Sequence, residues 1–410
     1  MTPLVSRLLR HGLIFAAVLG VMILGLRGWA GVRAGQKMNQ ALARAEQHWG
    51  ALEEGSAPPP LVPDEDNAAV PMRGAVASHG LPTSSLAAIN RLKARRGDVL
   101  AEPMVLQATV ADNAGALSLL DAALDLPVID WRANAPPGSH QPAGGPPVTL
   151  LISLATTNWV SGMLAIAEDQ PAMALAAIRR QLLLARSLED QPDLMSQVVR
   201  LRMISGALDL ARETLIRTAP DEELLRLLAA ELQALSGWEA LQQAMITDFK
   251  EMIRHHLALD KHGEAGVSAA GAWLLRPMSQ SSLAHDMEDY DALLTWVGTP
   301  RFARSDEGES ALRFAGSPLG AQLLDMADLV DARLVLARTA VSLSRQKAAM
   351  GAYPESLDAA PLDPLTGEPP LYQVVGDGFL LESGRKEFEA QATRSEPWGP
   401  AGLLSWQVPR

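Results

Sequence analysis

The sequence of 410 residues contains no cysteine. Disulfides, thiolate zinc sites, iron–sulfur clusters, thiol nucleophiles and a lipid anchor on cysteine are therefore excluded. Aromatic residues make up only 4%, and there are six lysines against twenty-nine arginines. Leucine and alanine dominate instead, and both favour helix. This composition predicts a mainly α-helical protein.

Positive charge is scarce beyond the N-terminal segment. The formal net charge is −12, and residues 1–49 carry six basic residues against one glutamate, or +5. The remaining 361 residues therefore carry −12 − 5 = −17. A body of this acidity repels phosphate backbones, so we predict no nucleic-acid partner.

An uncharged run, LIFAAVLGVMILGL, extends from Leu13 to Leu26. It reaches about twenty residues, 13–32, if the Arg27 side chain extends toward the lipid headgroups. Arg7 and Arg10 precede the run, which is the pattern of a secretory signal. We therefore predict that residues 13–32 form a single transmembrane helix.

Two further properties of this span are whether it is cleaved and in which direction it crosses the membrane. Gly28-Trp29-Ala30 is a poor cleavage site, so we favour an uncleaved signal anchor over residues 1–34, with an exported soluble protein as the alternative. The basic residues after the span outnumber those before it, which by itself would place the body inside. A long downstream domain can be translocated regardless of such charges. We predict the inner membrane of a bacterium, with the body in the periplasm.

Prolines divide the next part of the chain. Residues 35–82 are predicted to form a short helix through Trp49 and then a proline-rich spacer, because six prolines lie between residues 55 and 82. A second break extends from Asn134 to Val148. The segment between them, Leu86–Asp125, is weakly helical in pattern.

A short repeat marks two helix starts. Glu168-Asp169-Gln170-Pro171 recurs as Glu189-Asp190-Gln191-Pro192, and proline is favoured in the first turn of a helix. Leucine-rich periodicity follows both prolines and predicts four antiparallel helices between about 150 and 237. The 34-residue period of tetratricopeptide repeats is missing, so we predict an array of α-hairpins of another kind.

The remaining chain continues as helix before the pattern changes. Helices are predicted over Trp238–Leu259, over Ser279–Val297, and from Pro318 to about Met350, which completes a helical domain over residues 83–350. In the loop-rich segment 351–410, Leu371–Val375 and Phe379–Ser383 flank a Gly376-Asp377-Gly378 turn and predict a small β-hairpin.

Several stretches resemble a set of uncharacterised bacterial membrane-anchored helical proteins. These stretches are Val62–Ala69, Gln191–Leu210, Pro318–Gln346 and the ending AYPESLDAAPLDPLTGEPPLYQVVGDGFLLESG. The resemblance covers most of the chain. It implies a membrane-anchored helical architecture in the cell envelope and no particular activity.

The ending alone is also similar to the C-termini of type II secretion pseudopilins. The similarity rests on Tyr353-Pro354, Leu357, Asp363-Pro364, Gly367, Leu371-Tyr372 and Gly378-Phe379. The chain departs from that family because it has no prepilin cleavage motif, and Gly384-Arg385-Lys386-Glu387 replaces the acidic calcium loop. We therefore carry over neither pilus assembly nor calcium binding, and we expect a turn-rich cap on the helical core.

Carboxylates and imidazoles come close together in one predicted helix. Asp248, Glu251 and His255 share a helix face, with His256 and His262 nearby. The spacing matches neither a His-Glu-x-x-His zinc motif nor the paired Glu-x-x-His of di-iron bundles. We therefore predict no metal there and expect a solvated polar face, and we expect the same of the acidic run His285–Asp291.

Catalytic and nucleotide-binding motifs are also missing from the sequence. There is no Gly-x-Ser-x-Gly elbow, no phosphate-binding glycine loop and no dinucleotide fingerprint. We predict no catalytic, cofactor or metal residues, and a protein-interaction or scaffold role with a partner in the cell envelope. The alternatives are a periplasmic hydrolase that uses Glu251, His255 and His256, and an accessory of a secretion or pilus machine.

Overall fold

The computed structural model describes residues 3–50, 60–94, 103–132, 146–191, 193–233, 235–262, 269–304, 318–357, 360–384 and 404–408. It is mainly helical, with one small antiparallel sheet, as the composition predicts. The chain forms two compact units, and each is described by itself. The first consists of residues 1–57 and 246–296, and the second of residues 58–245 and 297–410. The units thus interleave along the chain, unlike the consecutive segments expected from the sequence.

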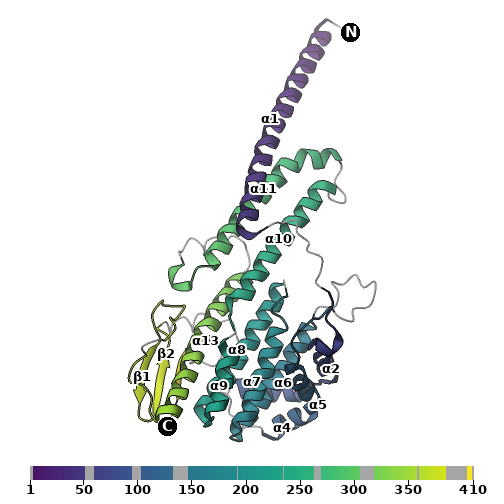
Figure 1. The fold of residues 1–410 in the computed structure, drawn as a ribbon. Coiled ribbons are helices and arrows are strands. Elements are labelled where there is room, and N and C mark those ends of the chain that lie inside the picture. The colour runs from purple at the N-terminus through teal and green to yellow at the C-terminus, as the bar shows by residue number, and fades with distance from the viewer. Residues whose placement is uncertain are drawn as a thin grey trace. The chain divides into compact units, whose positions relative to one another are not determined.

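Unit 1 is built on α1 (Pro3–Trp49), one continuous helix of 47 residues. At 1.5 Å per residue it is about 70 Å long, and Figure 1 shows it unbroken. The segment predicted to be an anchor and the short helix expected after it are therefore parts of one helix. Most side chains of the predicted span lie outside the described residues.

The other members of unit 1 are the later part of α10 (Trp238–His262) and α11 (Ala269–Val297). Helix α11 begins ten residues before the predicted start at Ser279 and contains Pro277 in its interior. The predicted start of α11 was too late in the chain, since proline usually ends a helix and Pro277 does not end this one. The Phe249 ring of α10 stacks on Tyr290 of α11, with 5.0 Å between ring centroids.

Unit 2 begins with η1 (Asp64–Asp66) and four short helices: α2 (Ala69–Ser78), α3 (Thr83–Ala94), α4 (Pro103–Asp112) and α5 (Ala114–Leu124). Helix α2 lies inside the expected proline-rich spacer and buries Met72 and Ala75. Pro71 is its third residue, where a helix needs no backbone donor. Proline density therefore misled the prediction here, because this proline lies in a first turn.

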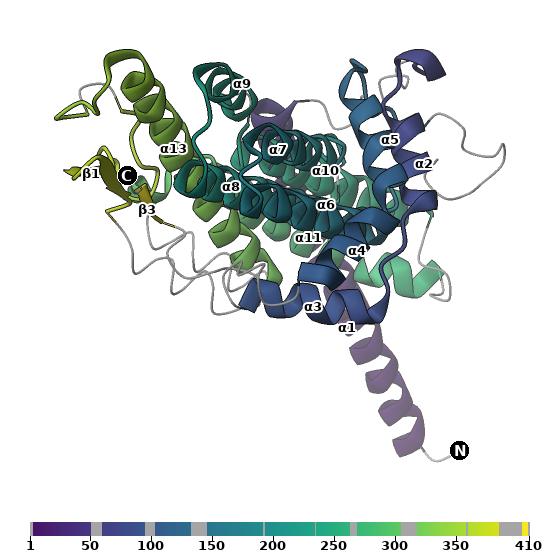
Figure 2. The ribbon, with the colours of Figure 1, turned by 90° about the horizontal axis from the view of Figure 1, so that it is seen from below.

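Four helices lie between residues 148 and 233, where four helices were predicted. They are α6 (Val148–Ala167), α7 (Pro171–Arg186), α8 (Leu194–Arg217) and α9 (Glu222–Gln233). Figures 1 and 2 show α6, α7 and α8 side by side. Pro171 opens α7 as expected, but α8 starts after Asp193, whose carboxylate accepts a hydrogen bond from the Ser196 amide at 2.8 Å.

Helix α6 is the one helix, among the described residues, that is long and apolar enough to cross a membrane. Sixty-one per cent of that apolar stretch is buried in the protein. Leu151, Leu154 and Val160 are fully buried. Helix α6 therefore has the burial of a core helix.

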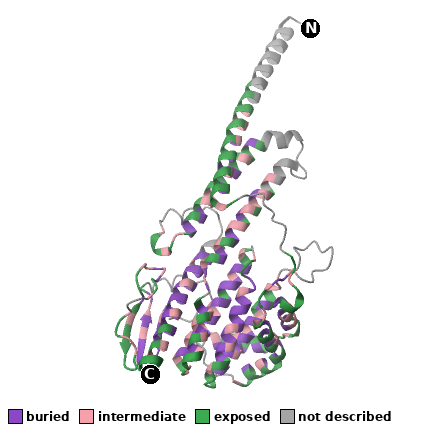
Figure 3. Ribbon diagram, in the orientation of Figure 1, coloured by how far each residue is buried: buried purple, intermediate pink, exposed green. Residues whose placement is uncertain are grey.

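Helix α13 (Pro318–Met350) packs on α8 and α9 and confirms the long helix predicted there. Its described part is buried over most of its length, as the purple stretches of Figure 3 show. Buried charges accompany the leucines: Asp328 and Arg333 are each 1% exposed. Periodicity of apolar residues predicted the helix but not its charged interior.

The C-terminal cap is a three-stranded antiparallel sheet in the order β1 (Leu371–Val375), β2 (Gly378–Glu382), β3 (Ser405–Val408). The first two strands confirm the predicted hairpin, whereas the third was not predicted. Asp363 organises the preceding loop. Its buried carboxylate accepts hydrogen bonds from the Leu365 amide and the Ser383 hydroxyl, and its carbonyl accepts one from the Gly367 amide at 2.8 Å.

The tight packing of α6 predicts a mutational effect. A β-carbon at Gly162 would lie 2.7 Å from a methyl of Leu210 and 3.0 Å from the β-carbon of Ala177. Gly162→Val should therefore lower the free energy of unfolding by about 1–3 kcal/mol through overpacking. Urea denaturation of the purified protein, followed by circular dichroism, measures this loss.

Gly115 provides the control, since it is exposed in α5 and a β-carbon there meets nothing within 4 Å. Gly115→Ala should leave stability unchanged or raise it by up to about 1 kcal/mol. Equal midpoints for Gly162→Val and the parent protein would contradict the close approach of α6 to α8.

Candidate functional site

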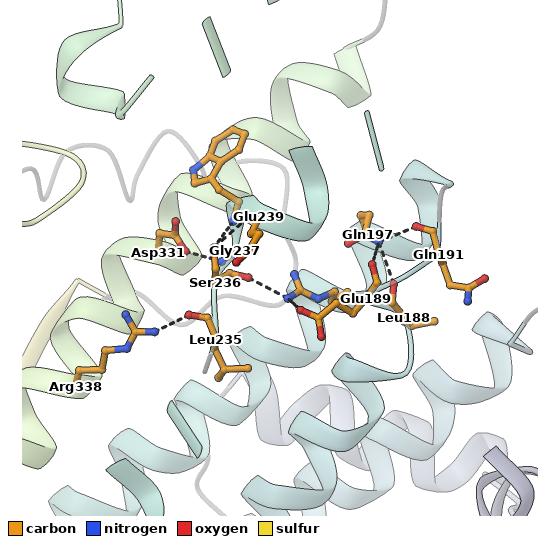
Figure 4. A network of polar contacts seen from close by, with 12 residues as sticks. Leu188, Glu189, Gln191, Gln197, Leu235, Ser236, Gly237, Glu239, Asp331 and Arg338 are labelled. Carbon is orange, nitrogen blue, oxygen red and sulfur yellow. Dashed lines mark hydrogen bonds and ion pairs between the residues drawn. The ribbon is translucent and has the colours of Figure 1, made fainter. Parts of the chain in front are cut away.

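The most polar part of the interior lies in unit 2, where the connection between α9 and α10 passes between α8 and α13 (Figure 4). The Arg200 guanidinium of α8 donates to the Ser236 carbonyl at 3.0 Å, and it pairs with Glu189 at 3.3 Å. From α13, Arg338 donates to the Leu232 carbonyl at 2.9 Å and to the Leu235 carbonyl at 2.5 Å. Two arginines thus bind the backbone carbonyls at the end of α9.

A carboxylate completes this arrangement. The Gly237 amide donates to Asp331 of α13 at 2.6 Å. A β-carbon at residue 237 would lie 2.8 Å from that carboxylate oxygen and 3.0 Å from the Ala327 carbonyl oxygen, so only glycine fits this close approach. Burial raises the pKa of Asp331, while the Gly237 amide and nearby arginines oppose the rise.

Gln197 fixes the neighbouring turn before α8. Its side-chain amide donates to the Leu188 and Gln191 carbonyls, both at 2.9 Å. Figure 4 shows Gln197 and Glu189 beside the chain that carries Ser236 and Gly237. Arg200 is 2% exposed, and its Nε and Nη1 atoms have no hydrogen-bond partner among the residues the structure describes. Burial also lowers the pKa of Arg200.

A second buried group surrounds Asp328 of α13. One carboxylate oxygen accepts a hydrogen bond from the Trp238 indole at 2.8 Å, and the other pairs with Arg304 at 2.6 Å. The Arg304 guanidinium also stacks over the Trp238 ring, 4.4 Å from its centroid. Burial raises the pKa of Asp328 to about 6, although Arg304 favours the ionised form.

A third group joins α3, α6, α8 and α13. Arg333, 1% exposed, pairs with Asp209 at 2.5 Å and donates to the Ser205 hydroxyl. The Lys93 ammonium lies 5.5 Å from the centroid of the Trp159 ring. Burial lowers the pKa of Lys93 to about 8, and Asp209 opposes this shift.

These groups connect helices. Each of the four carboxylates, on Glu189, Asp209, Asp328 and Asp331, accepts a hydrogen bond from an arginine or a backbone amide. Arginine does not release its proton at physiological pH. No group of three or more histidine, aspartate and glutamate side chains within the described residues could hold a metal ion. These contacts therefore hold the helices of unit 2 together in its interior.

The residues named for a hydrolase lie elsewhere, in unit 1. Glu251 is exposed and pairs with Arg254, and His255 is exposed as well. The side chains of His256 and His262 lie outside the described residues. Asp248 accepts a hydrogen bond from the Tyr290 hydroxyl at 3.2 Å. Glu251 and His255 do not form the buried, mutually facing pair that the hydrolase hypothesis requires.

The acidic run His285–Asp291 is partly solvated, as expected. His285 and Asp289 are 3.6 Å apart at the surface. Glu288 and Asp291, however, contact α1: Glu288 pairs with Arg44 at 2.9 Å, and Asp291 accepts a hydrogen bond from the Trp49 indole at 2.7 Å. Part of this run therefore attaches α11 to the long N-terminal helix.

Sequence reasoning missed the buried arginines. Arg180, Arg200 and Arg333 are each 3% exposed or less, and each lies on a helix rich in leucine. The available signal was a single arginine at a position that helical periodicity assigns to the buried side. That signal does not identify the partner carboxylate, which comes from another helix.

No family model, no curated protein and no solved structure matches this chain.

The raised pKa of Asp328 predicts that the stability of the folded protein depends on pH. Because its pKa is raised from 3.8 to about 6, the folded protein keeps this proton between about pH 4 and pH 6 while the unfolded chain releases it. The free energy of unfolding should therefore fall as pH rises through this window, by up to about 3 kcal/mol from this group. Urea denaturation at pH 4, 5, 6 and 7 measures the slope.

Asp328→Asn should lose this part of the slope, because an asparagine side chain has no proton to release between pH 4 and pH 7. Asp325→Asn is the control, because Asp325 is 35% exposed and lies 3.8 Å from Arg301. It should keep the slope of the parent protein and cost under about 1 kcal/mol. An unchanged slope in Asp328→Asn would refute the assignment.

Proposed function

We propose that the protein is a single-span protein of the bacterial inner membrane whose helical body, in the periplasm, binds a protein partner. The observation that carries the anchor is α1. Its run from Leu13 to Leu26 is uncharged, and the helix continues without a break to Trp49. Twenty apolar residues in a helix match the thickness of a bilayer core.

The described side chains of α1 support this proposal. Met22, Leu26, Trp29 and Val32 are between 55% and 64% exposed and recur at spacings of four, three and three, which places them on one side of the helix. The Arg33 guanidinium lies over the Trp29 ring, 5.2 Å from its centroid. Tryptophan and arginine at the end of an apolar run are typical of a membrane interface.

The proposal that the protein binds a partner is based on the surface of its helical body. Antiparallel helices stacked side by side offer an extended surface to a partner. Met104, Met173 and Met195, in the first turns of α4, α7 and α8, are 81%, 52% and 60% exposed. Exposed methionines occur at adaptable protein-binding surfaces. Since residues 50–410 carry a net charge of −17, the partner should present a basic surface.

The proposed anchor predicts that charged substitutions in the span release the protein from the membrane fraction. Val18→Arg combined with Ile23→Arg adds two charges to the span, each costing about 2.5–3.5 kcal/mol near the helix centre. This variant should leave the carbonate-resistant membrane pellet, as measured by immunoblotting of fractions. Val18→Leu combined with Ile23→Leu is the matched control and should stay in the pellet. Retention of the arginine variant would contradict the span.

The partner is tested by photo-crosslinking in living cells. A photoreactive residue placed at 104, 173 or 195 should yield the same cross-linked protein from at least one position, as determined by mass spectrometry. Glu222, an exposed position at the start of α9, is the control and should not yield it. Raised salt should weaken the complex of the purified proteins. Products identical at all positions, or insensitive to salt, would contradict a specific acidic interface.

A further inference from the structure

Helices α1 and α11 of unit 1 run in the same direction. A β-carbon at Gly31 would lie 4.0 Å from the Pro277 ring, Arg44 pairs with Glu288, and His48 lies 3.0 Å from Asp291. Residue numbers rise together along both helices, so these contacts fix their register. Pro277 is level with Gly31.

Gly31 lies where the surroundings of α1 change. Before it, Met22, Leu26 and Trp29 are exposed, whereas Ala34 and Met38 after it are buried in unit 1. If residues 13–32 span the bilayer, the edge of the hydrocarbon core falls beside Gly31. This step rests on the proposed anchor.

The first part of α11 therefore begins close to the membrane edge. Residues Ala269–Leu275 read AAGAWLL and carry no charge, and Arg276 and Pro277 follow. They are helical in backbone, and Ala269 is eight residues, or about 12 Å of helix, from Pro277. The polar interface on each side of a bilayer is itself about 5–8 Å thick. Figure 1 shows the first turns of α11 directed away from α1, and the rest of α11 alongside α1.

We infer that Ala269–Leu275 is a second membrane contact, which enters the interface of the phospholipid bilayer on the side where α1 leaves it. The composition of Ala269–Leu275 fits a position at the bilayer interface. An uncharged helical segment with one tryptophan, followed by an arginine, matches the aromatic and basic residues that are enriched at membrane interfaces. Two contacts, at Gly31 and at this segment, would hold unit 1 in one orientation to the membrane.

The absence of cysteine makes a direct measurement simple. The full-length protein is given one cysteine, carrying a nitroxide spin label, and is reconstituted into vesicles of phosphatidylethanolamine and phosphatidylglycerol. Accessibility to oxygen, which enters lipid, is compared with accessibility to a water-soluble nickel complex. The positions are Ala272→Cys for the segment, Gly20→Cys for the span and Ser282→Cys, an exposed position farther along α11, for water.

We expect the label at 272 to lose access to the nickel complex and to gain access to oxygen, as at position 20, while the label at 282 stays accessible to nickel. If the label at position 20 is in lipid and the label at position 272 is in water, the inference is overturned, while the proposed anchor is supported. If both report water, the proposed anchor fails as well.

A label at 272 that is shielded from both reagents would also overturn the inference, because a protein surface and not lipid would then cover the segment. Should Ala272→Cys fail to fold, Ala269→Cys tests the same side of the helix about one turn closer to its start. Bilayer contact predicts the same oxygen-rich, nickel-poor pattern there, and a water-accessible label at 269 would overturn the inference.

Discussion

The arrangement of unit 2 depends on the charged residues buried along α13. Asp328 holds Trp238 and Arg304, Asp331 holds the Gly237 amide, and Arg338 holds the carbonyls at the end of α9. Arg333 reaches α8 through Asp209. Removing one member of such a buried pair leaves an uncompensated charge, which costs about 3–5 kcal/mol. These pairs therefore help to specify which helices lie next to α13.

This use of charge bears on function. The buried carboxylates and guanidinium groups of unit 2 bind backbone groups or one another, so the interior acts as a rigid support. We therefore propose that the functional surfaces lie on the exterior: the exposed apolar side of α1, the start of α11 and the acidic surface of the body. The C-terminal ending fits the same view. Asp363 and Gly367 close a loop, because the Gly367 amide donates a hydrogen bond to the Asp363 carbonyl. Gly367 has φ = +75°, and a β-carbon there would lie 2.9 Å from the Phe302 ring.

The segment Val62–Ala69 has a similar structural role. Asn67 is buried, and its side chain donates to the Asp130 carbonyl at 2.8 Å and accepts a hydrogen bond from the Asp130 amide at 2.9 Å. It thereby joins the start of α2 to a stretch of chain sixty-three residues later. Asn67 therefore connects two stretches of chain that are distant in the sequence.

The sequence by itself determined the local elements. Apolar periodicity and proline placement predicted α7, α9, α13 and the first hairpin of the sheet, because these signals act within a few residues. Burial and long-range pairing were decided only by the tertiary structure. Pro277 lies within a helix, Ser405–Val408 joins the sheet as a third strand, and Arg200, Arg333 and Asp328 are buried. The physical reason is that each of these outcomes depends on a partner distant in the chain, which no local pattern specifies.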